Sequence, residues 1–479
     1  MLVRDKCPFT WENPLVKKCF YPGRKGTFIV KPVLQLSRVL RVVFDDDKSV
    51  PVAGLVIPLR LGDRLGFRET INRLVTGCDR GRRANSGDKS LNLVAMLLAG
   101  GDYLSDVSLF RSGATLSRLG YRLFSESRLG EWLRSLTDAD VAGFRESVTR
   151  VGVTAWQQGL GPDLSVNNDL DPLVVDIDST FVETHGSTKT GTEKRNYKGS
   201  RGYHPLLAVE ADTGQVINAM LRPGNTADAN DAAVFVDDTL DRIRRLADHS
   251  TSLCLRADSG FYMWDLLDAC RRHHSYFSVT VRKYGPIVDI INSIKDDQWH
   301  TIEKTDLGQI DITEAEYQIK GRNPTPGPPI NARLIIKRAT TYADQGKPQP
   351  HLFDLHEYHA FVTNQPGNPV TLWRRHNHRA VIETTIRDLK YNLGLNHFPS
   401  ASYTANQAWL QLNTHAWNLT RYTATLLNNP ALTLKTLRWR YFNTPGRITT
   451  GSRTNTLHYP TNWPWQDHIK HALTTLTAA

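Results

Sequence analysis

Short apolar runs alternate with amphipathic stretches between residues 172 and 281. Runs of β-forming residues bounded by turn signals predict strands at residues 173–178, 204–210, 215–221, 253–257 and 276–281. The segment Asp212-Thr213-Gly214 predicts a hairpin turn between the second and third strands. Helices are predicted over residues 229–246, where apolar residues repeat at helical spacing, and over 262–272. The order strand, hairpin, helix, strand, helix, strand predicts an α/β unit.

A different pattern follows from residue 283 to about 368. Further short β-forming runs predict strands at residues 310–319, 333–337 and 358–363. A Pro/Gly-rich loop at 321–329 interrupts them, so this segment is predicted to be a β-rich insertion. Helices are then predicted over residues 376–393 and 405–427. From Asn443 onward Pro, Gly, Thr and Asn dominate, so we expect a tail that is loose or docks on a partner.

The first 165 residues have a helical pattern after a short β-forming start. Strands are predicted at residues 28–30 and 34–43. The apolar segment 91–99 stops at Gly100, a typical helix end. Residues 127–136 place apolar side chains on one helical face, and Thr137-x-x-Asp140 resembles a capping box that begins another helix. Two short helices with a tight join are typical either of a helix-turn-helix that reads DNA or of an ordinary small helical bundle, and both interpretations stay open.

The charge of the chain indicates a polyanionic partner. The 479 residues suffice for several domains, and 40% of them are hydrophobic, which excludes a disordered protein. The net charge of +11 favours nucleic acid as the partner. Residues 1–44 carry nine Lys or Arg and two acids, and residues 371–460 carry eleven and two. Basic flanks around a more acidic centre are typical of a protein that binds phosphates and keeps carboxylates for chemistry.

The cysteines and the apolar segments limit the cellular setting. The five cysteines form no Cys-x-x-Cys pair, which argues against a zinc site or a disulfide framework and indicates reduced thiols. The chain shows no apolar run that resembles a signal peptide, and no segment approaches the length of a membrane span. We therefore expect a soluble cytoplasmic protein, associated with the nucleoid and without a membrane partner.

Three carboxylates lie at positions that favour metal chemistry. Asp178 ends the first predicted strand, Asp258 ends the fourth, and Glu383 lies on the helix after the insertion. Ligands collect at the strand ends of an open sheet, and magnesium takes one or two carboxylates per ion. Two such ions can hold the attacking and the leaving oxygen of a phosphodiester in line. For each acid by itself, a turn former or a helix cap is the commoner role.

The helix that carries Glu383 has an uneven distribution of charge. Its apolar stripe consists of Ile382, Ile386, Leu389 and Leu393, and the stripe beside it consists of His376, Arg379, Glu383, Arg387 and Lys390. A solvated face with ion pairs between residues four apart would explain Arg379 and Arg387 on either side of Glu383. It would not explain the excess of basic groups. A phosphate backbone beside a metal-binding acid would require that excess.

The spacing of this helix resembles a known signature. His376-x2-Arg379-x3-Glu383-x6-Lys390 is similar to the Tyr-Arg-Glu-Lys signature of cut-and-paste insertion-sequence transposases with an RNase H-like DDE core. His376 stands where that signature has tyrosine. Histidine can also donate to a phosphate, although its charge varies near neutral pH, so its role stays open.

Other segments extend the resemblance over about residues 90–450. Asp178 before Ser-Thr, and Asp258 in the run Ala-Asp-Ser-Gly-Phe, resemble the first two acids of that family. Stretches similar to those common in the family lie at residues 201–206, 222–226 and 362–364. Taken together, these elements are most similar to the insertion-sequence family numbered thirteen-eighty.

The resemblance implies the fold class and the domains. The expected fold is α/β, with an RNase H-like mixed-sheet catalytic core and a β-rich insertion domain, preceded by a mainly helical N-terminal DNA-binding region. The implied domains are an N-terminal region at 1–165, the first part of the core at 166–282, the insertion domain at 283–370, the core helix bearing the glutamate with the following helices at 371–430, and a C-terminal tail at 431–479.

The resemblance also implies an activity, that of a DDE transposase. Asp178, Asp258 and Glu383 would be the catalytic residues and would hold two magnesium ions, with manganese as a substitute. The enzyme would cleave DNA at the ends of its element and transfer the strands into target DNA. Whether the ends form hairpins stays an open question. Its partners would be double-stranded DNA, as terminal inverted repeats and as target, and a second copy in a homodimer. The alternatives are an inactive DDE-derived regulator that binds DNA sequence-specifically and a nuclease that cuts without joining.

Five residues are expected to bind DNA. Arg379 and Lys390 would contact phosphates at the transposon end, and His376 and Arg387 belong to the same stripe. Trp299, the only tryptophan of the insertion, would stack a flipped base. A place in the core of the insertion is an equally good interpretation of Trp299.

Asp176 competes with Asp178 as a ligand. Because side chains alternate along a strand, both lie on one face. We favour Asp178, which stands before Ser-Thr as in the family. Asp176 remains an alternative ligand or a support for the ligands.

Overall fold

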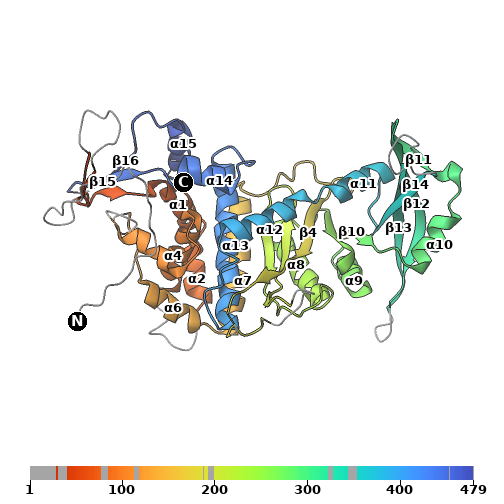
Figure 1. Cartoon of the computed structure of the whole chain (residues 1–479), viewed down its shortest axis with the longest axis horizontal. Helices are drawn as coiled ribbons and strands as arrows, with labels where there is room; N and C mark the ends of the chain where they lie inside the picture. Colours follow the sequence, from red (N-terminus) through yellow and green to blue (C-terminus); the bar gives the residue numbers. More distant parts are fainter. Residues whose placement is uncertain are drawn as a thin grey trace, which may run out of the picture.

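The computed structural model describes residues 28–30, 40–76, 85–112, 117, 119–186, 188–192, 199–321, 327–342, 353–452 and 454–477. Figure 1 shows three parts in a row. A mainly helical part contains segments from both ends of the chain, an α/β core lies in the middle, and a β-rich part lies at the far end.

The central sheet has an RNase H-like strand order. Its strands are β4 (Leu173–Ser179), β7 (Leu206–Glu210), β8 (Val216–Met220), β9 (Leu253–Ala257) and β10 (Tyr276–Val281). They lie in the order β8-β7-β4-β9-β10, with β4, β9 and β10 parallel and β7 antiparallel to both of its neighbours. The predicted strands, the hairpin and the mixed α/β fold class are therefore confirmed. Two short strands, β5 (Val182–Glu183) and β6 (Gly202–Tyr203), pair with each other.

Helices cover both faces of this sheet. They are α8 (Ala232–Leu246), α9 (Trp264–Arg272), α12 (Ala380–Asn392) and α13 (Tyr403–Leu426). Leu206 and Ala208 of β7 belong to the apolar cluster with α8 and α9, whereas Leu207 and Val209 belong to the cluster with α12 and α13. Ile177 of β4 lies in the cluster with α8 and α9. Because side chains alternate along a strand, the even-numbered residues of β4 face α12 and α13.

The predicted β-rich insertion is confirmed, and it continues the core sheet. Its antiparallel strands are β11 (His300–Thr305), β12 (Gly308–Ile319), β13 (Ile330–Thr341) and β14 (Leu355–Thr363). Because β14 also pairs with the free edge of β10, all nine strands form one sheet in the order β11-β12-β13-β14-β10-β9-β4-β7-β8. Before them, α10 (Gly285–Ser293) buries Ile287 and Ile291, and the short turn η4 (Asp296–Gln298) leads into β11.

The N-terminal part confirms several local predictions. Strands β1 (Phe28–Val30) and β2 (Leu40–Val42) pair with each other, as the β-forming start predicts, and residues 34–39 of the second predicted strand lie outside the described residues. The helices that follow are η1 (Ala53–Leu55), α1 (Val56–Arg64), α2 (Phe67–Leu74), α4 (Ser86–Ala99), η2 (Leu104–Arg111), α6 (Glu126–Arg134) and α7 (Asp138–Gln157). Gly100 ends α4 with a φ of 105°. At the start of α7, Thr137 and Asp140 form the predicted capping box.

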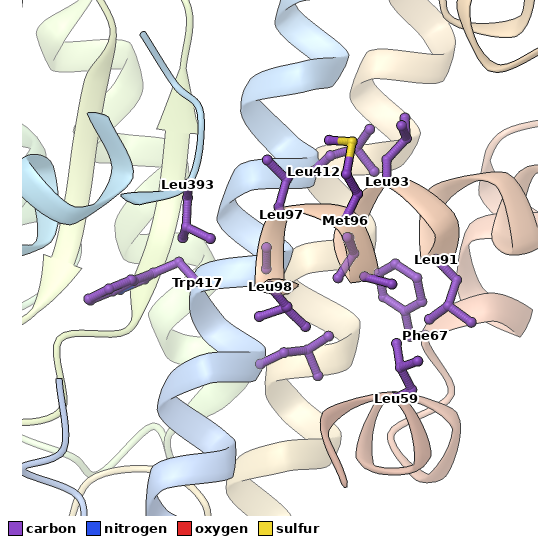
Figure 2. Close-up of a cluster of buried hydrophobic side chains, with 14 of the residues drawn as sticks. Leu59, Phe67, Leu91, Leu93, Met96, Leu97, Leu98, Leu393, Leu412 and Trp417 are labelled. Carbon is purple, nitrogen blue, oxygen red and sulfur yellow. The ribbon is translucent and has the colours of Figure 1, made fainter. Parts of the chain in front are cut away.

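One hydrophobic core joins the helical part to the sheet. Figure 2 shows Met96 and Leu97 of α4 beside Leu412 of α13. Phe67 of α2 lies on one side of them, and Trp417 of α13 points toward the sheet on the other. The helical part is therefore packed firmly against the face of the core that α13 covers.

Helix α7 lies inside the molecule. It packs against α13, α2 and α8, and its residues Phe144, Val148 and Val151 are buried. In the expected helix-turn-helix this helix would be the one that reads DNA. Because other helices cover it, the packing favours the alternative interpretation, a helical bundle.

The C-terminal segment is not the loose tail that its composition suggests. It forms α14 (Leu434–Leu437), the π-helix η5 (Arg438–Phe442), β15 (Gly446–Thr450), β16 (Asn455–His458) and α15 (Gln466–Thr477). β15 pairs with β3 (Ser49–Val50), and α15 packs against α1. The tail therefore docks on the N-terminal part of its own chain, and strand pairing satisfies its backbone groups.

Cys254 and Cys270 are buried free thiols, as expected for reduced cysteines. Cys7, Cys19 and Cys78 lie outside the described residues. None of the described helices is by itself long and apolar enough to cross a membrane, although α4 and η2 together, bent by 91°, have the required length and composition.

Candidate active site

Adjacent parallel strands bring Asp178 and Asp258 to one edge of the sheet. Ile177 of β4 lies opposite Ala257 of β9, and each acid directly follows one of these two residues along the chain. The Asp178 carboxylate accepts a hydrogen bond of 2.7 Å from the backbone N–H of Ser179. Asp258 begins the turn η3 (Ser259–Phe261) as its N-cap, and its carboxylate accepts one of 2.8 Å from the N–H of Gly260.

A third acid, Asp228, lies at the same edge, although no motif in the sequence marks it. It belongs to the loop between β8 and α8. Its Oδ1 accepts a hydrogen bond of 2.7 Å from the Ser179 hydroxyl and lies 3.4 Å from Nε2 of His204. Gly260 is so close that an added Cβ would be 3.2 Å from the Cβ of Asp228. Asp228 therefore contacts residues next to both strand-end acids.

Arg222 holds the loop that carries Asp228. The Arg222 side chain is 1% exposed and donates hydrogen bonds to the carbonyls of Ala227, Asp228 and Asn230, at 3.1, 3.2 and 2.8 Å. Arg222 begins a run that resembles the transposase family, whereas Asp228 lies two residues beyond that run. The signal for this loop was present in the sequence, but the convergence of Asp228 with the other acids was not.

The site concentrates negative charge. Burial is the main reason that the pKa of Asp178 is raised, to about 6, and the carboxylates of Asp258 and Asp228 raise it further. The guanidinium of Arg379 and the N–H of Ser179 act in the opposite direction. A partly buried carboxylate with other carboxylates beside it is stabilised by a cation, so this donor set suits a divalent metal.

Glu383 lies on a helix that begins later than predicted. The structure has two helices, α11 (Pro369–Asn377) and α12, so the prediction of one helix over 376–393 is wrong. Arg379 becomes the N-cap of α12, and Glu383, which is exposed, lies in its first turn. α12 packs against β4 on the face to which Asp178 belongs. The structure therefore brings Asp178 and Asp258 together and places the helix of Glu383 over the same strand ends.

Three possible ligand atoms lie mutually within 4.8 Å in one group of the described residues, formed by Asp237, Asp241 and His273. Asp178, Asp258 and Glu383 do not form such a closed group. A pair of ions that share the acids does not require one, since each ion takes only one or two carboxylates. Asp237 is already paired with Arg272 at 2.7 Å, which partly neutralises this group between α8 and the end of α9.

Two of the expected DNA-binding residues lie beside Asp178. Nη2 of Arg379 is 3.4 Å from the carbonyl oxygen of Ile177, and its buried Nε–H has no hydrogen-bond partner among the described residues. Lys390 donates a hydrogen bond of 2.9 Å to the carbonyl of Phe181, and burial lowers its pKa. Arg387 is exposed on the same helix.

His376 lies elsewhere. It is 7% exposed, in the last turn of α11, and its ring stacks on Phe361 with the centroids 4.1 Å apart. Its Nδ1 is hydrogen-bonded to the Ser278 hydroxyl at 2.7 Å and its Nε2 to the Thr280 hydroxyl at 2.9 Å. Both ring nitrogens are thus engaged inside the protein, and the structure does not bring His376 to the surface with Arg379 and Arg387.

The buried His376 ring leads to a prediction about pH. Burial lowers its pKa from 6.5 to about 3, so the native state holds the neutral ring. The contribution of His376 to stability is then complete above pH 6.5 and is lost as the pH falls toward 3. We expect the stability difference between wild type and His376→Gln to shrink by about 2 kcal/mol from pH 7 to pH 5.

Denaturant unfolding of both proteins at the two pH values checks this expectation. Only the difference between them is informative, because the raised pKa of Glu210 makes stability change in the opposite direction over the same range. His249→Gln, at an exposed histidine, serves as the control and should show no such change. A difference for His376→Gln that stays constant with pH would contradict the assignment of a neutral buried ring.

Trp299 is half-buried in the insertion. The guanidinium of Arg338 lies over its ring, 4.4 Å from the centroid, and the ring of Tyr358 is 6.0 Å away. It packs against the apolar cluster beneath α8 and α9. These contacts favour a structural role in the insertion over stacking on a DNA base.

Comparisons with known proteins show the family of the chain. Residues 34–479 match the family model described as transposase DDE domain group 1. No curated protein matches the chain significantly. Among solved structures, the piggyBac transposase in a synaptic complex with hairpin DNA, determined by cryo-EM, is 12% identical and has a TM-score of 0.42. That similarity covers 82% of this chain and 80% of the other.

Proposed function

The chain belongs to the family of transposase DDE domains of group 1, and we propose that it is a cut-and-paste insertion-sequence transposase. It would cleave DNA at the ends of its element and join those ends to target DNA. The observation that carries the proposal is the convergence of Asp178 and Asp258 at the ends of adjacent parallel strands, with the helix of Glu383 packed over the same edge.

Asp178, Asp258 and Glu383 are proposed to hold two magnesium ions, for which manganese can substitute. The donor set fits, because it consists of carboxylate oxygens and because Asp178 lies among like charges that a cation would stabilise. When bound, the ions would activate the attacking oxygen and stabilise the charge on the phosphodiester. Phosphodiester chemistry of this kind requires no serine or tyrosine nucleophile.

The basic residues of α12 are proposed to bind the DNA backbone. Arg379 is half-buried beside Asp178, so its guanidinium would contact a phosphate of DNA bound at the strand-end acids. Arg387 is exposed one turn beyond Glu383, where it would contact a phosphate further along the DNA strand. Lys390 would contact a phosphate near the segment that follows β4, because its ammonium group is hydrogen-bonded to the carbonyl of Phe181 in that segment. The proposed substrates are terminal inverted repeats and target DNA, bridged by a homodimer.

Cleavage of the DNA that flanks the gene tests this proposal. The purified full-length chain is incubated with fragments that contain the expected inverted repeats, with magnesium, with manganese or with a chelator. We expect cuts at the repeat ends only when metal is present, and labelled ends joined to a plasmid. Binding without cutting in either metal would favour the inactive regulator instead, and cutting without joining would favour a nuclease.

A further inference from the structure

Arg256 and Asp176 form a buried ion pair in the middle of the sheet. They are direct partners in the parallel pairing of β4 and β9, and their exposures are 2% and 0%. Nε of Arg256 lies 2.5 Å from Oδ1 of Asp176, and Nη2 lies 2.8 Å from Oδ2. The contact is therefore bidentate. Each residue stands two positions before a strand-end acid, on the face that α12 covers.

The same guanidinium holds the chain where α11 ends. Arg256 donates one hydrogen bond to the carbonyl of Arg375 and another, of 2.6 Å, to the carbonyl of His378. The Arg375 carbonyl also accepts a hydrogen bond of 3.1 Å from the backbone N–H of His378, so Arg256 joins the turn that ends α11 at both of its ends. Ser278, the partner of Arg256 on β10, is hydrogen-bonded to the neighbouring His376. A row of side chains across three strands thus attaches the end of α11 to the sheet.

The attached segment leads directly into α12, which follows α11 along the chain (Figure 1). Arg379 follows His378 directly and is the N-cap of α12, whose first turn contains Glu383. Any shift of the attached segment would move Arg379 and Glu383 together, relative to Asp178 and Asp258. The ion pair lies on the two strands that carry those acids, so it connects both strands to the start of the helix.

We propose that Asp176 and Arg256 are positioning residues that hold the helix of Glu383 in place against the two strand-end acids. The inference rests on the proposed function, because the position of Glu383 matters only if the three acids form one site. Both oxygens of Asp176 face Arg256 inside the sheet, so Asp176 acts through Arg256 and is no metal ligand. A buried ion pair adds little net stability, which leaves positioning as its main effect.

The test compares Arg256→Lys with wild type in the full-length chain. Lysine keeps the charge but cannot span the carboxylate and both carbonyls. We expect the single-turnover rate of magnesium-dependent end cleavage to fall about 10- to 100-fold, with the affinity for end DNA nearly unchanged. Hydrogen–deuterium exchange should increase at residues 377–385 and stay unchanged in α13.

Arg242→Lys is the matched control. Arg242 is 8% exposed and likewise joins a carboxylate, that of Asp238 at 3.0 Å, to a backbone carbonyl, that of Arg145 at 2.8 Å. It connects α8 to α7, away from α12. We expect this variant to cleave at the wild-type rate per folded molecule and to leave the exchange of residues 377–385 unchanged.

Two results would overturn the inference. The first is that Arg256→Lys cleaves at the wild-type rate. The second is that Arg256→Lys loses end binding and cleavage in equal proportion while hydrogen–deuterium exchange rises throughout the chain. If Arg256→Lys does not fold, Asp176→Asn, which preserves the shape, is measured in the same way and decides the question. If wild type itself does not cleave, the proposed function fails, and exchange at residues 377–385 still tests the attachment.

Discussion

Glu383→Gln is expected to lower the rate of end cleavage at least about 1,000-fold, which corresponds to about 4 kcal/mol of transition-state stabilisation. Glutamine keeps the size and shape of the side chain but removes the charge that a metal ion requires. End binding should persist, because the proposed phosphate contacts of Arg379 and Arg387 are retained. The measurement combines single-turnover cleavage in magnesium with a binding titration on the same end DNA.

The matched control is Glu126→Gln. Glu126 is also an exposed glutamate in the first turn of a helix, α6, so both substitutions remove the same interaction with a helix N-terminus, worth about 0.3–1 kcal/mol. We expect Glu126→Gln to cleave like wild type and both variants to unfold at nearly the wild-type midpoint. Normal nicking by Glu383→Gln in magnesium would remove Glu383 from the site and with it the proposed arrangement of the ions.

Gly54→Ala is expected to lower the free energy of unfolding by at least about 3 kcal/mol. Gly54 lies in η1, where an added Cβ would be 1.6 Å from the carbonyl oxygen of Tyr441 in the π-helix η5. The contact is with backbone, which cannot move aside as a flexible side chain can. The adjacent N–H of Ala53 donates a hydrogen bond of 2.9 Å to the carbonyl of Thr444, which fixes the two segments further. Denaturant unfolding measures the loss.

Gly285→Ala is the control for this prediction. Gly285 begins α10, and an added Cβ there would meet nothing within 4 Å. Alanine favours the helix, so the expected change is neutral or slightly stabilising. Wild-type stability of Gly54→Ala would mean that the N-terminal and C-terminal segments do not pack as described. The same packing predicts that the segment after residue 443 is required for the N-terminal part to fold.

Local signals explain why much of the fold could be predicted. β-forming runs that end in turn residues marked β4, β7, β8, β9 and β10, because a strand and its turn are specified by neighbouring residues. The strand assignments placed Asp178 and Asp258 at strand ends, and the parallel pairing of β4 and β9 then brought both acids to one edge of the sheet. The capping box at Thr137 located the start of α7 for the same reason.

Other parts of the site depend on residues far away along the chain. Residues 376–393 have helical periodicity throughout and contain no proline or glycine, so nothing local indicates the break before α12. The break is held by Arg256, which stands 119 residues before Arg375. His376 would lie on the same helical stripe as Arg379 and Glu383 only if one continuous helix covered residues 376–393. Once the helix ends, its ring turns into the protein and stacks on Phe361.

The sequence by itself determined the strands of the core, their order along the chain and the two acids at the ends of β4 and β9, because each of these has a signal within a few neighbouring residues. Only the tertiary structure decided which of these pieces meet. It joined the insertion to the core sheet, placed Asp228 beside Asp178, buried α7 and returned the C-terminal segment to β3. Such contacts join residues that are far apart in sequence, so their geometry is set by the packing of the whole chain rather than by any local pattern.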